Sequence, residues 1–396
     1  MSLTIAILTG RYGDGHIKAA EALRDAMVQL NDRQNINTVL FDVTDLLPQF
    51  ADKLTKKLFV SGIKRFPSLY DYLYEKTRAE SKITTIAKKR LHGLGLGQLY
   101  EWLGEKKPDA IISTFPVASG MLSELKELGL IITPIYTVIT DHTVHSSWIN
   151  PYIDHYFVAS KLVKRDMIKY GVPESFITVT GIPVHPNFSL PFSKRKVKGK
   201  LGLNPDLPCI LLAGGGFGVF NKIENLLQEL NDLMVPFEVV VICGRNQRLL
   251  KRIKKKEVEY LYPLKLLGFV ENMHEWMAAA DLLVTKPGGI TVSEAIAAEV
   301  PMLIVRALGG QENDNLHFLL QSGTALYTEN PGMLRDKLKK LLTPGSLDVL
   351  KQAMIPYQWQ KDSAFLVCRK VLEETCALGR TANAAVGDIP VLEPGI

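Results

Sequence analysis

One stretch, residues 282–316, constrains the fold of this chain more than any other. It begins with a short apolar run at 282–284 that predicts the end of a buried strand, and Lys286-Pro287-Gly288-Gly289 then breaks the backbone. A helix is expected to restart at Thr291, and residues 302–305 predict a second buried strand. The order strand, glycine turn, helix, strand is typical of an α/β protein with a parallel sheet.

The polar residues of this stretch indicate a ligand. Gly288 and Gly289 allow positive φ and close approach of a ligand to the main chain, and the helix that follows offers free N–H groups to a phosphate. Lys286 could supply an additional positive charge. Behind the second strand, a loop expected at 309–315 carries donors and acceptors suited to sugar hydroxyls, namely Gln311, Glu312 and Asn315. A double glycine alone is common in α/β proteins, but these features share one βαβ unit and predict a nucleotide-sugar site.

Length and composition narrow the class of protein. The 396 residues exceed what one hydrophobic core usually holds, so two domains are expected. No run reaches the ~18 consecutive apolar residues of a membrane span, and the N-terminus lacks the basic segment of a signal peptide. The cysteines show no close C-x-x-C pair, which favours reduced thiols in a cytoplasmic protein: Cys209, Cys243, Cys368 and Cys376.

The first half opens with a buried strand at 4–8 and a turn at 9–16 that leads into a helix at 17–30. Gly13 and Gly15 let the turn tighten, and His16 falls at the helix N-terminus, where the dipole favours a neutral imidazole. A neutral histidine beside a cleft can act as a general base. The alternative is an ordinary glycine turn with a bystander histidine.

Two further turns are expected at the same edge of the first sheet. A strand near 109–112 leads to Phe115, and a strand at 131–139 is followed by Asp141, His145 and Trp148. Because ligands of open α/β sheets bind beyond the carboxyl ends of the strands, these side chains are expected to face one cleft as an acceptor site. The alternative for Asp141 is a helix cap.

Basic residues cluster in several segments of the chain. Residues 50–74 interleave lysine and arginine with apolar side chains, and 88–90 add three more basic residues, so this part could lie on an anionic membrane. Packing of its apolar stripe against the domain core is the alternative. Residues 191–200 are basic and turn-rich, which predicts an interdomain hinge. The net charge of +6 comes without any nucleic-acid motif.

The second half repeats the α/β pattern. A strand at 209–213 is followed by a glycine run that includes Gly215 and Gly216, which is either a phosphate cradle or an empty tight turn. A strand at 237–243 ends near Arg245, and the next strand is followed by Phe269 and Val270. Residues from Gly379 onward are expected to form a loosely held tail.

The motifs resemble glycosyltransferase family 28, the group with the diacylglycerol glucosyl- and galactosyltransferases, and residues 282–316 carry the closest match. Further matches are Gly-x-Gly-His at 13–16, Thr-Asp followed by His-x-x-Trp at 140–148, and Thr-Gly-Ile-Pro at 180–183. The glycine run of the family is shorter here, because Tyr12 and Asp14 interrupt it. The resemblance implies the GT-B fold, α/β with two doubly wound Rossmann-like domains facing a central cleft. It implies an acceptor-binding, membrane-facing domain at 1–190, a donor-binding domain at 200–378 with a final helix packing back, and a flexible tail at 379–396.

The resemblance also assigns roles to residues. His16 and Asp141 are its candidate bases, with Asp141 alternatively orienting the acceptor, and the acceptor site is completed by Gly15, Phe115, His145 and Trp148. The donor site would comprise Gly215, Gly216, Arg245, Phe269, Val270, Lys286, Gly288, Gly289, Thr291, Glu294, Gln311, Glu312 and Asn315. Phe269 and Val270 would meet the uracil, Thr291 a phosphate and Glu294 the ribose. No paired D-x-D is present, so no metal and no cofactor are expected.

The implied activity is an inverting transfer of a hexose from a UDP-sugar to diacylglycerol, on the inner face of the cell membrane. UDP-glucose is favoured and UDP-galactose remains open. Three alternatives stay open on the sequence: an N-acetylglucosaminyltransferase on a lipid-linked acceptor, a UDP-N-acetylglucosamine epimerase of the same fold, and a UDP-sugar sensor without activity.

Overall fold

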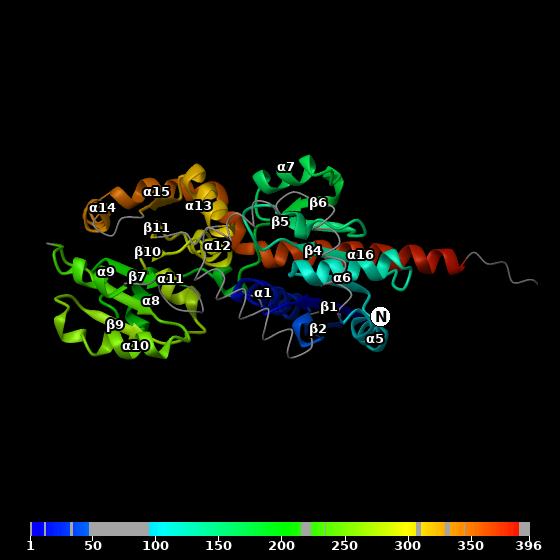
Figure 1. The fold of residues 1–396 in the computed structure, drawn as a ribbon, viewed down its shortest axis with the longest axis horizontal. Coiled ribbons are helices and arrows are strands. Elements are labelled where there is room, and N and C mark those ends of the chain that lie inside the picture. The colour runs from blue at the N-terminus through cyan, green and yellow to red at the C-terminus, as the bar shows by residue number, and fades with distance from the viewer. Residues whose placement is uncertain are drawn as a thin grey trace, which may run out of the picture.

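A computed structural model shows two α/β domains arranged along the long axis of the molecule (Figure 1). Each domain is built on a six-stranded parallel sheet. The structure describes residues 2–11, 13–31, 35–46, 95–214, 223–233, 235–305, 310–328, 333–343 and 345–387. The basic segments at 50–74 and 88–90, together with Gly215 and Gly216, lie outside the described residues.

The first sheet has the order β2-β1-β3-β4-β5-β6. Its strands are β1 (Leu3–Thr9), β2 (Ile36–Asp42), β3 (Ala110–Ser113), β4 (Ile135–Val138), β5 (His155–Val158) and β6 (Ile177–Val179). Among the described residues, the helices that accompany it include α1 (Asp14–Leu30), α5 (Leu96–Lys106), α6 (Pro116–Glu127) and α7 (Lys161–Lys169). The strand order reverses between β1 and β3, so the crevice of this sheet opens beyond the ends of β1, β3 and β4.

The second sheet has the order β12-β11-β10-β7-β8-β9. Its strands are β7 (Cys209–Ala213), β8 (Glu238–Ile242), β9 (Leu264–Leu267), β10 (Leu282–Thr285), β11 (Met302–Ile304) and β12 (Ala325–Tyr327). Its helices include α9 (Ile223–Leu230), α10 (Gln247–Lys254), α11 (Met273–Ala279), α12 (Gly289–Ala297), α13 (Gln311–Ser322), α14 (Leu334–Leu341) and α15 (Ser346–Met354). The order reverses between β7 and β10, which places the second crevice beside the turn that leads into α12.

Helices cover both faces of each sheet, which explains why the strands read as continuous apolar runs. The strand β7 is buried at all of its positions, and so are β8 and β10. The last helix, α16 (Ser363–Gly387), leaves the second domain and packs on the first (Figure 1). Its Cys368 thiol contacts the Leu23 carbonyl of α1 at 3.4 Å, and Val367 and Val371 are fully buried there.

The connection between the domains differs from the predicted hinge at 191–200. Residues 194–200 form a helix, α8 (Lys194–Lys200), which is anchored to the second domain because Lys194 and the buried Lys198 both pair with Asp281, at 2.8 and 3.0 Å. The chain crosses earlier, around Ile182. There the Ser363 hydroxyl at the start of α16 donates to the Ile182 carbonyl at 2.9 Å, so the two segments that connect the domains lie side by side.

Two other predicted segments are helical. Residues 311–315, expected in a polar loop, form the first turns of α13, and their side chains therefore project from a fixed scaffold. The helix α16 continues through Gly387, into the segment expected to be a loosely held tail. Among the described residues, no helix combines the length and apolar character needed to cross a membrane.

Candidate active site

His16 stands at the carboxyl end of β1, as the third residue of α1. Its Nδ1 lies 2.9 Å from the hydroxyl of Thr140, which follows β4, and its ring packs near Phe115 and Trp148 at centroid distances of 5.2 and 5.8 Å. Burial lowers the pKa of His16 to about 4, although a hydrogen bond with the Thr114 backbone opposes the shift. The imidazole is therefore neutral at pH 7, as the position predicts.

Close packing around Phe115 fixes this turn. A Cβ on Gly10 would lie 2.5 Å from the Phe115 ring, so only glycine fits between β1 and that side chain. Gly13 has φ of 117°, a conformation that also favours glycine. Gly15 is different, because its φ is not positive and nothing lies within 4 Å of a Cβ placed there.

Asp141 follows Thr140 and reaches across to the second domain. Its Oδ2 accepts a hydrogen bond of 3.1 Å from the Gln311 amide at the start of α13, and the Trp148 side chain also donates to this carboxylate. Burial raises the pKa of Asp141 to about 6; the Trp148 bond opposes the shift and the nearby Asp314 adds to it. The carboxylate is thus ionised at pH 7 but has an unusually high proton affinity.

Trp148 and His145 belong to one small structural unit. His145 precedes a 3₁₀ turn, η2 (Ser146–Trp148), and its Nδ1 accepts from the Ser147 backbone at 3.1 Å. This cap holds the buried Trp148 between His16 and Asp141. The structure brings Phe115, Trp148, His16 and Asp141 together, whereas His145 acts on them through Trp148.

In the second domain, α12 begins at Gly289, with Gly288 as its N-cap, and it faces the turn at Thr140. Neither glycine has a positive φ, so the conformational reason predicted from the sequence is wrong for both. Gly289 is required for another reason: a Cβ there would lie only 2.6 Å from the Thr140 carbonyl oxygen of the first domain. The glycine permits contact between domains at the turn that carries Asp141.

Polar side chains of α12 and α13 complete the part of the site that the second domain provides. Thr291 and Glu294 are buried on α12, and Glu294 pairs with Lys18 of α1 at 3.5 Å. Lys286 pairs with Glu312 at 2.7 Å, and the Asn315 amide donates to the Pro287 carbonyl at 3.0 Å. These contacts tie the turn at 286–289 to the start of α13.

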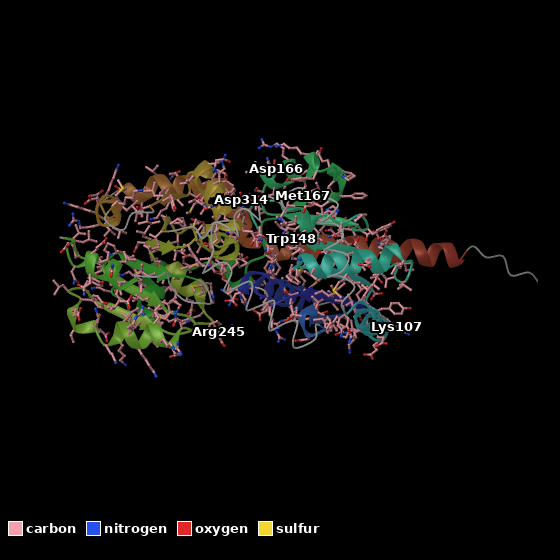
Figure 2. The ribbon with its side chains drawn as sticks, in the orientation of Figure 1. Lys107, Trp148, Asp166, Met167, Arg245 and Asp314 are labelled. Atoms are coloured by element: carbon pink, nitrogen blue, oxygen red, sulfur yellow. The ribbon has the colours of Figure 1, made fainter. Side chains whose placement is uncertain are left out.

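The candidates for uracil binding lie in the turns that follow β8 and β9. Phe269 is 51% exposed, and the Arg245 guanidinium carbon sits 5.0 Å from the centre of its ring. Arg245 also approaches Asp14 of α1 at 3.9 Å, and Figure 2 shows it at the edge of the second domain that faces α1. Val270 packs against the core of the second domain.

His142 is a functional candidate that sequence analysis did not single out. It comes from the first domain, yet it contacts the second: its N–H donates to Asn315 at 3.0 Å, its Nε2 lies 3.2 Å from the Ser293 hydroxyl, and its ring stacks on Phe318 at 4.3 Å. Burial lowers its pKa to about 3, with a hydrogen bond to the Gly289 backbone opposing. The only sequence signal was its place beside Asp141.

Within the described part of the chain, no group of three or more His, Cys, Asp or Glu side chains is arranged to hold a metal ion. Among the described residues, the cationic groups near this site include Lys286, Arg245 and Lys18, and the N-termini of α12 and α13 add dipolar N–H groups.

Comparison with known proteins places the chain in a family. The monogalactosyldiacylglycerol (MGDG) synthase model matches residues 16–184, and the glycosyltransferase family 28 C-terminal domain matches 209–359. A processive diacylglycerol beta-glucosyltransferase of Bacillus cytotoxicus is 31% identical, over 99% of this chain and 97% of its own. The one of Staphylococcus epidermidis ATCC 12228 is 32% identical over 85% and 84%. The chain belongs to the family of the diacylglycerol glucosyltransferases.

Solved structures show the fold of this family 28 member. MurG of Acinetobacter baumannii is similar with a TM-score of 0.60, at 17% identity over 93% of this chain and 99% of its own. Phytolacca americana UGT2, solved with UDP-2-fluoro-glucose and pterostilbene, gives 0.59 at 14% identity over 95% and 99%. The predicted family and the predicted GT-B fold of two doubly wound domains are both confirmed.

One prediction for this member of the diacylglycerol glucosyltransferase family concerns the contacts that His142 makes with Ser293 and Phe318. Replacing His142 with alanine removes the ring that stacks on Phe318 and bonds Ser293, so we expect the domains to close less often and kcat/KM for the donor to fall about 10-fold or more. Steady-state kinetics with varied donor measure the change. His317→Ala, an exposed site on the same helix α13, is the control and should retain wild-type kinetics. Equal kinetics for both variants would contradict the role of His142.

Proposed function

We propose that this protein transfers glucose from UDP-glucose to diacylglycerol, with inversion, and so makes a β-glucosyl diacylglycerol. The observation that carries the proposal is a contact between the two domains. Asp141 and His16 of the first domain lie against Gln311 and the turn before α12 in the second. Membership of a family of diacylglycerol beta-glucosyltransferases supports the choice of substrates. The glucose of UDP-glucose is α-linked, so a β-product requires inversion.

The donor occupies the second domain in this proposal. The uracil stacks at Phe269 beside Arg245, and Glu294 meets the ribose. Gln311, Glu312 and Asn315 present amide and carboxylate groups from the first turns of α13 to the hydroxyls of the glucose. Since Gln311 also bonds Asp141, the sugar is held next to the group that acts on the acceptor.

Asp141 takes the proton of the acceptor hydroxyl. Both Asp141 and His16 are unprotonated at pH 7, but a general base works best when its pKa is near the operating pH. With a pKa of about 6 against about 4 for His16, Asp141 retains the proton better. His16, fixed by Thr140, orients the acceptor hydroxyl with its neutral ring.

In the transfer step the acceptor oxygen forms a bond to C1 of glucose while the bond from C1 to the β-phosphate oxygen breaks. The electron pair of the broken bond goes to UDP, and the proton goes to Asp141. Free N–H groups at the start of α12, the helix dipole and Lys286 stabilise the negative charge that develops on the phosphate.

The acceptor lipid requires work at a membrane surface. We propose that the first domain faces the inner leaflet and that the basic segment at 50–74 takes part in this contact. The relatives are named processive, so the glucosyl diacylglycerol product is proposed to return as acceptor for a second glucose.

The test is transfer of labelled sugar by the purified protein into diacylglycerol in neutral detergent micelles. UDP-glucose, UDP-galactose and UDP-N-acetylglucosamine are supplied separately, and the lipid products are identified by mass spectrometry. Glucosyl diacylglycerol from UDP-glucose is the expected result. Product from another donor alone would overturn the choice of glucose, and no lipid product at all would overturn the transferase proposal.

Excess chelator provides a further prediction. Because protein dipoles and Lys286 stabilise the leaving UDP in this scheme, we expect the initial rate to be the same with EDTA as with added Mg²⁺. Loss of the rate in EDTA that returns on addition of Mg²⁺ would contradict that assignment.

A further inference from the structure

A strongly basic surface with exposed aliphatic side chains lies on the second domain, next to the site described above. Residues 245–256 contain seven Lys and Arg and no Asp or Glu. The exposed members on and after α10 are Arg248, Lys251, Arg252, Lys254, Lys255 and Lys256. Of these, Arg252 pairs with Glu224, and within the described residues the other five form no ion pair.

The turn that follows α10 exposes two aliphatic residues almost completely. Val258 is 92% exposed and Leu261 is 81% exposed, whereas their neighbours Tyr260 and Tyr262 are buried in the core. Glu257 and Glu259 accompany them, and Glu259 accepts a hydrogen bond from Gln228. Exposure to solvent is enough to explain the basic residues of this helix. It does not explain why two aliphatic side chains beside them are also exposed to solvent.

The position of this surface is set by Arg245. Arg245 approaches Asp14 at the first turn of α1, the helix that carries His16, and α10 begins two residues later. The basic surface therefore begins beside the contact between Arg245 and α1 and continues along α10 of the second domain. Figure 1 shows α10 at the lower edge of that domain, with α14 and α15 at the opposite edge.

From this arrangement we infer that α10 and the turn at 257–261 form a membrane-docking surface of the second domain, which binds an anionic lipid leaflet. Lysine and arginine beside a few aliphatic side chains match a bilayer, because the charges attract anionic headgroups while Val258 and Leu261 enter the interface. The inference rests on the proposed lipid acceptor. Docking through both domains would hold the mouth of the cleft against the surface from which diacylglycerol is taken.

Flotation with vesicles tests the docking surface. The variant Lys254→Gln/Lys255→Gln/Lys256→Gln is compared with Lys339→Gln/Lys340→Gln/Lys351→Gln, which loses the same charge from α14 and α15 at the opposite edge. On vesicles containing phosphatidylglycerol, we expect the partition coefficient to fall about 100-fold for the α10 variant. The control should bind like wild type.

A second variant separates the aliphatic contribution. Val258→Ser/Leu261→Ser keeps every charge, and we expect it to bind more weakly than wild type at high salt, where headgroup attraction is screened. Equal binding of the α10 variant and its control would overturn the inference, and so would a wild type that floats equally with neutral vesicles.

Activity in neutral detergent micelles distinguishes this inference from the proposed function. There the docking surface is not needed, so all variants should make glucosyl diacylglycerol at the wild-type kcat. A wild type inactive in micelles would contradict the proposed function, whereas equal flotation of variant and control would contradict only the docking surface.

Discussion

Replacing Asp141 with asparagine is expected to lower kcat about 1000-fold, the scale typical of removing a general base. The amide has the same shape and can still accept the hydrogen bond from Gln311, so the contact between domains is kept. What is lost is the proton acceptor. Initial rates with saturating UDP-glucose measure the effect, and calorimetric binding of UDP checks that the donor site is intact.

The pH dependence identifies the base. A base must be unprotonated to act, so log kcat/KM of the wild type should fall as pH drops below about 6, the pKa of Asp141. This acidic decrease in kcat/KM should disappear in Asp141→Asn. His16, with a pKa of about 4, stays neutral through that range and should leave the decrease in place when replaced by alanine. A decrease in kcat/KM near pH 4 that depends on His16 would instead make His16 the general base and contradict that role for Asp141.

Replacing Gly289 with alanine is expected to lower kcat about 100-fold. The added methyl group would lie 2.6 Å from the Thr140 carbonyl oxygen, which is backbone and cannot swing aside as a flexible side chain can. The turn that carries Asp141 and His142 must then move away from α12, and displacements of about 1 Å cost roughly this much in rate. Steady-state kinetics measure the loss.

Gly288→Ala is the matched control. Gly288 has φ of −75°, and no protein atom lies within 4 Å of a Cβ placed there, so this variant should leave the turn at Thr140 in place and lose far less activity than Gly289→Ala. Both changes add one methyl group at the start of the same helix, and they differ in whether the added Cβ meets the Thr140 carbonyl oxygen. A fully active Gly289→Ala enzyme would show that the close approach of Thr140 is not needed for catalysis.

Local patterns in the sequence were sufficient to predict much of the fold. Apolar runs such as 209–213 appear as buried strands because helices cover both faces of each sheet. The carboxyl ends of the strands then bring His16, Phe115 and Trp148 together, as expected for turns at one edge of a parallel sheet.

Features that depend on contacts between distant residues were missed. The segment at 191–200 is charged like a linker, but Asp281, far along the chain, pairs with two of its lysines and holds it as a helix. Apart from its place beside Asp141, His142 gave no signal, because its partners, Asn315 and Phe318, belong to the other domain. In α13 a signal was present: Glu312 and Asp314 are acidic residues of the kind that favour a first helical turn.

The most direct test of the central claim is the anomeric configuration of the lipid product. Purified protein, UDP-glucose and diacylglycerol micelles are combined with excess chelator, and the glucosyl diacylglycerol is analysed by proton NMR. We expect a β-anomeric signal on a glucose linked to the lipid hydroxyl, as a single displacement at the cleft requires. An α-anomeric signal would contradict the single displacement, and consumption of UDP-glucose without any glycolipid would contradict the transfer to diacylglycerol.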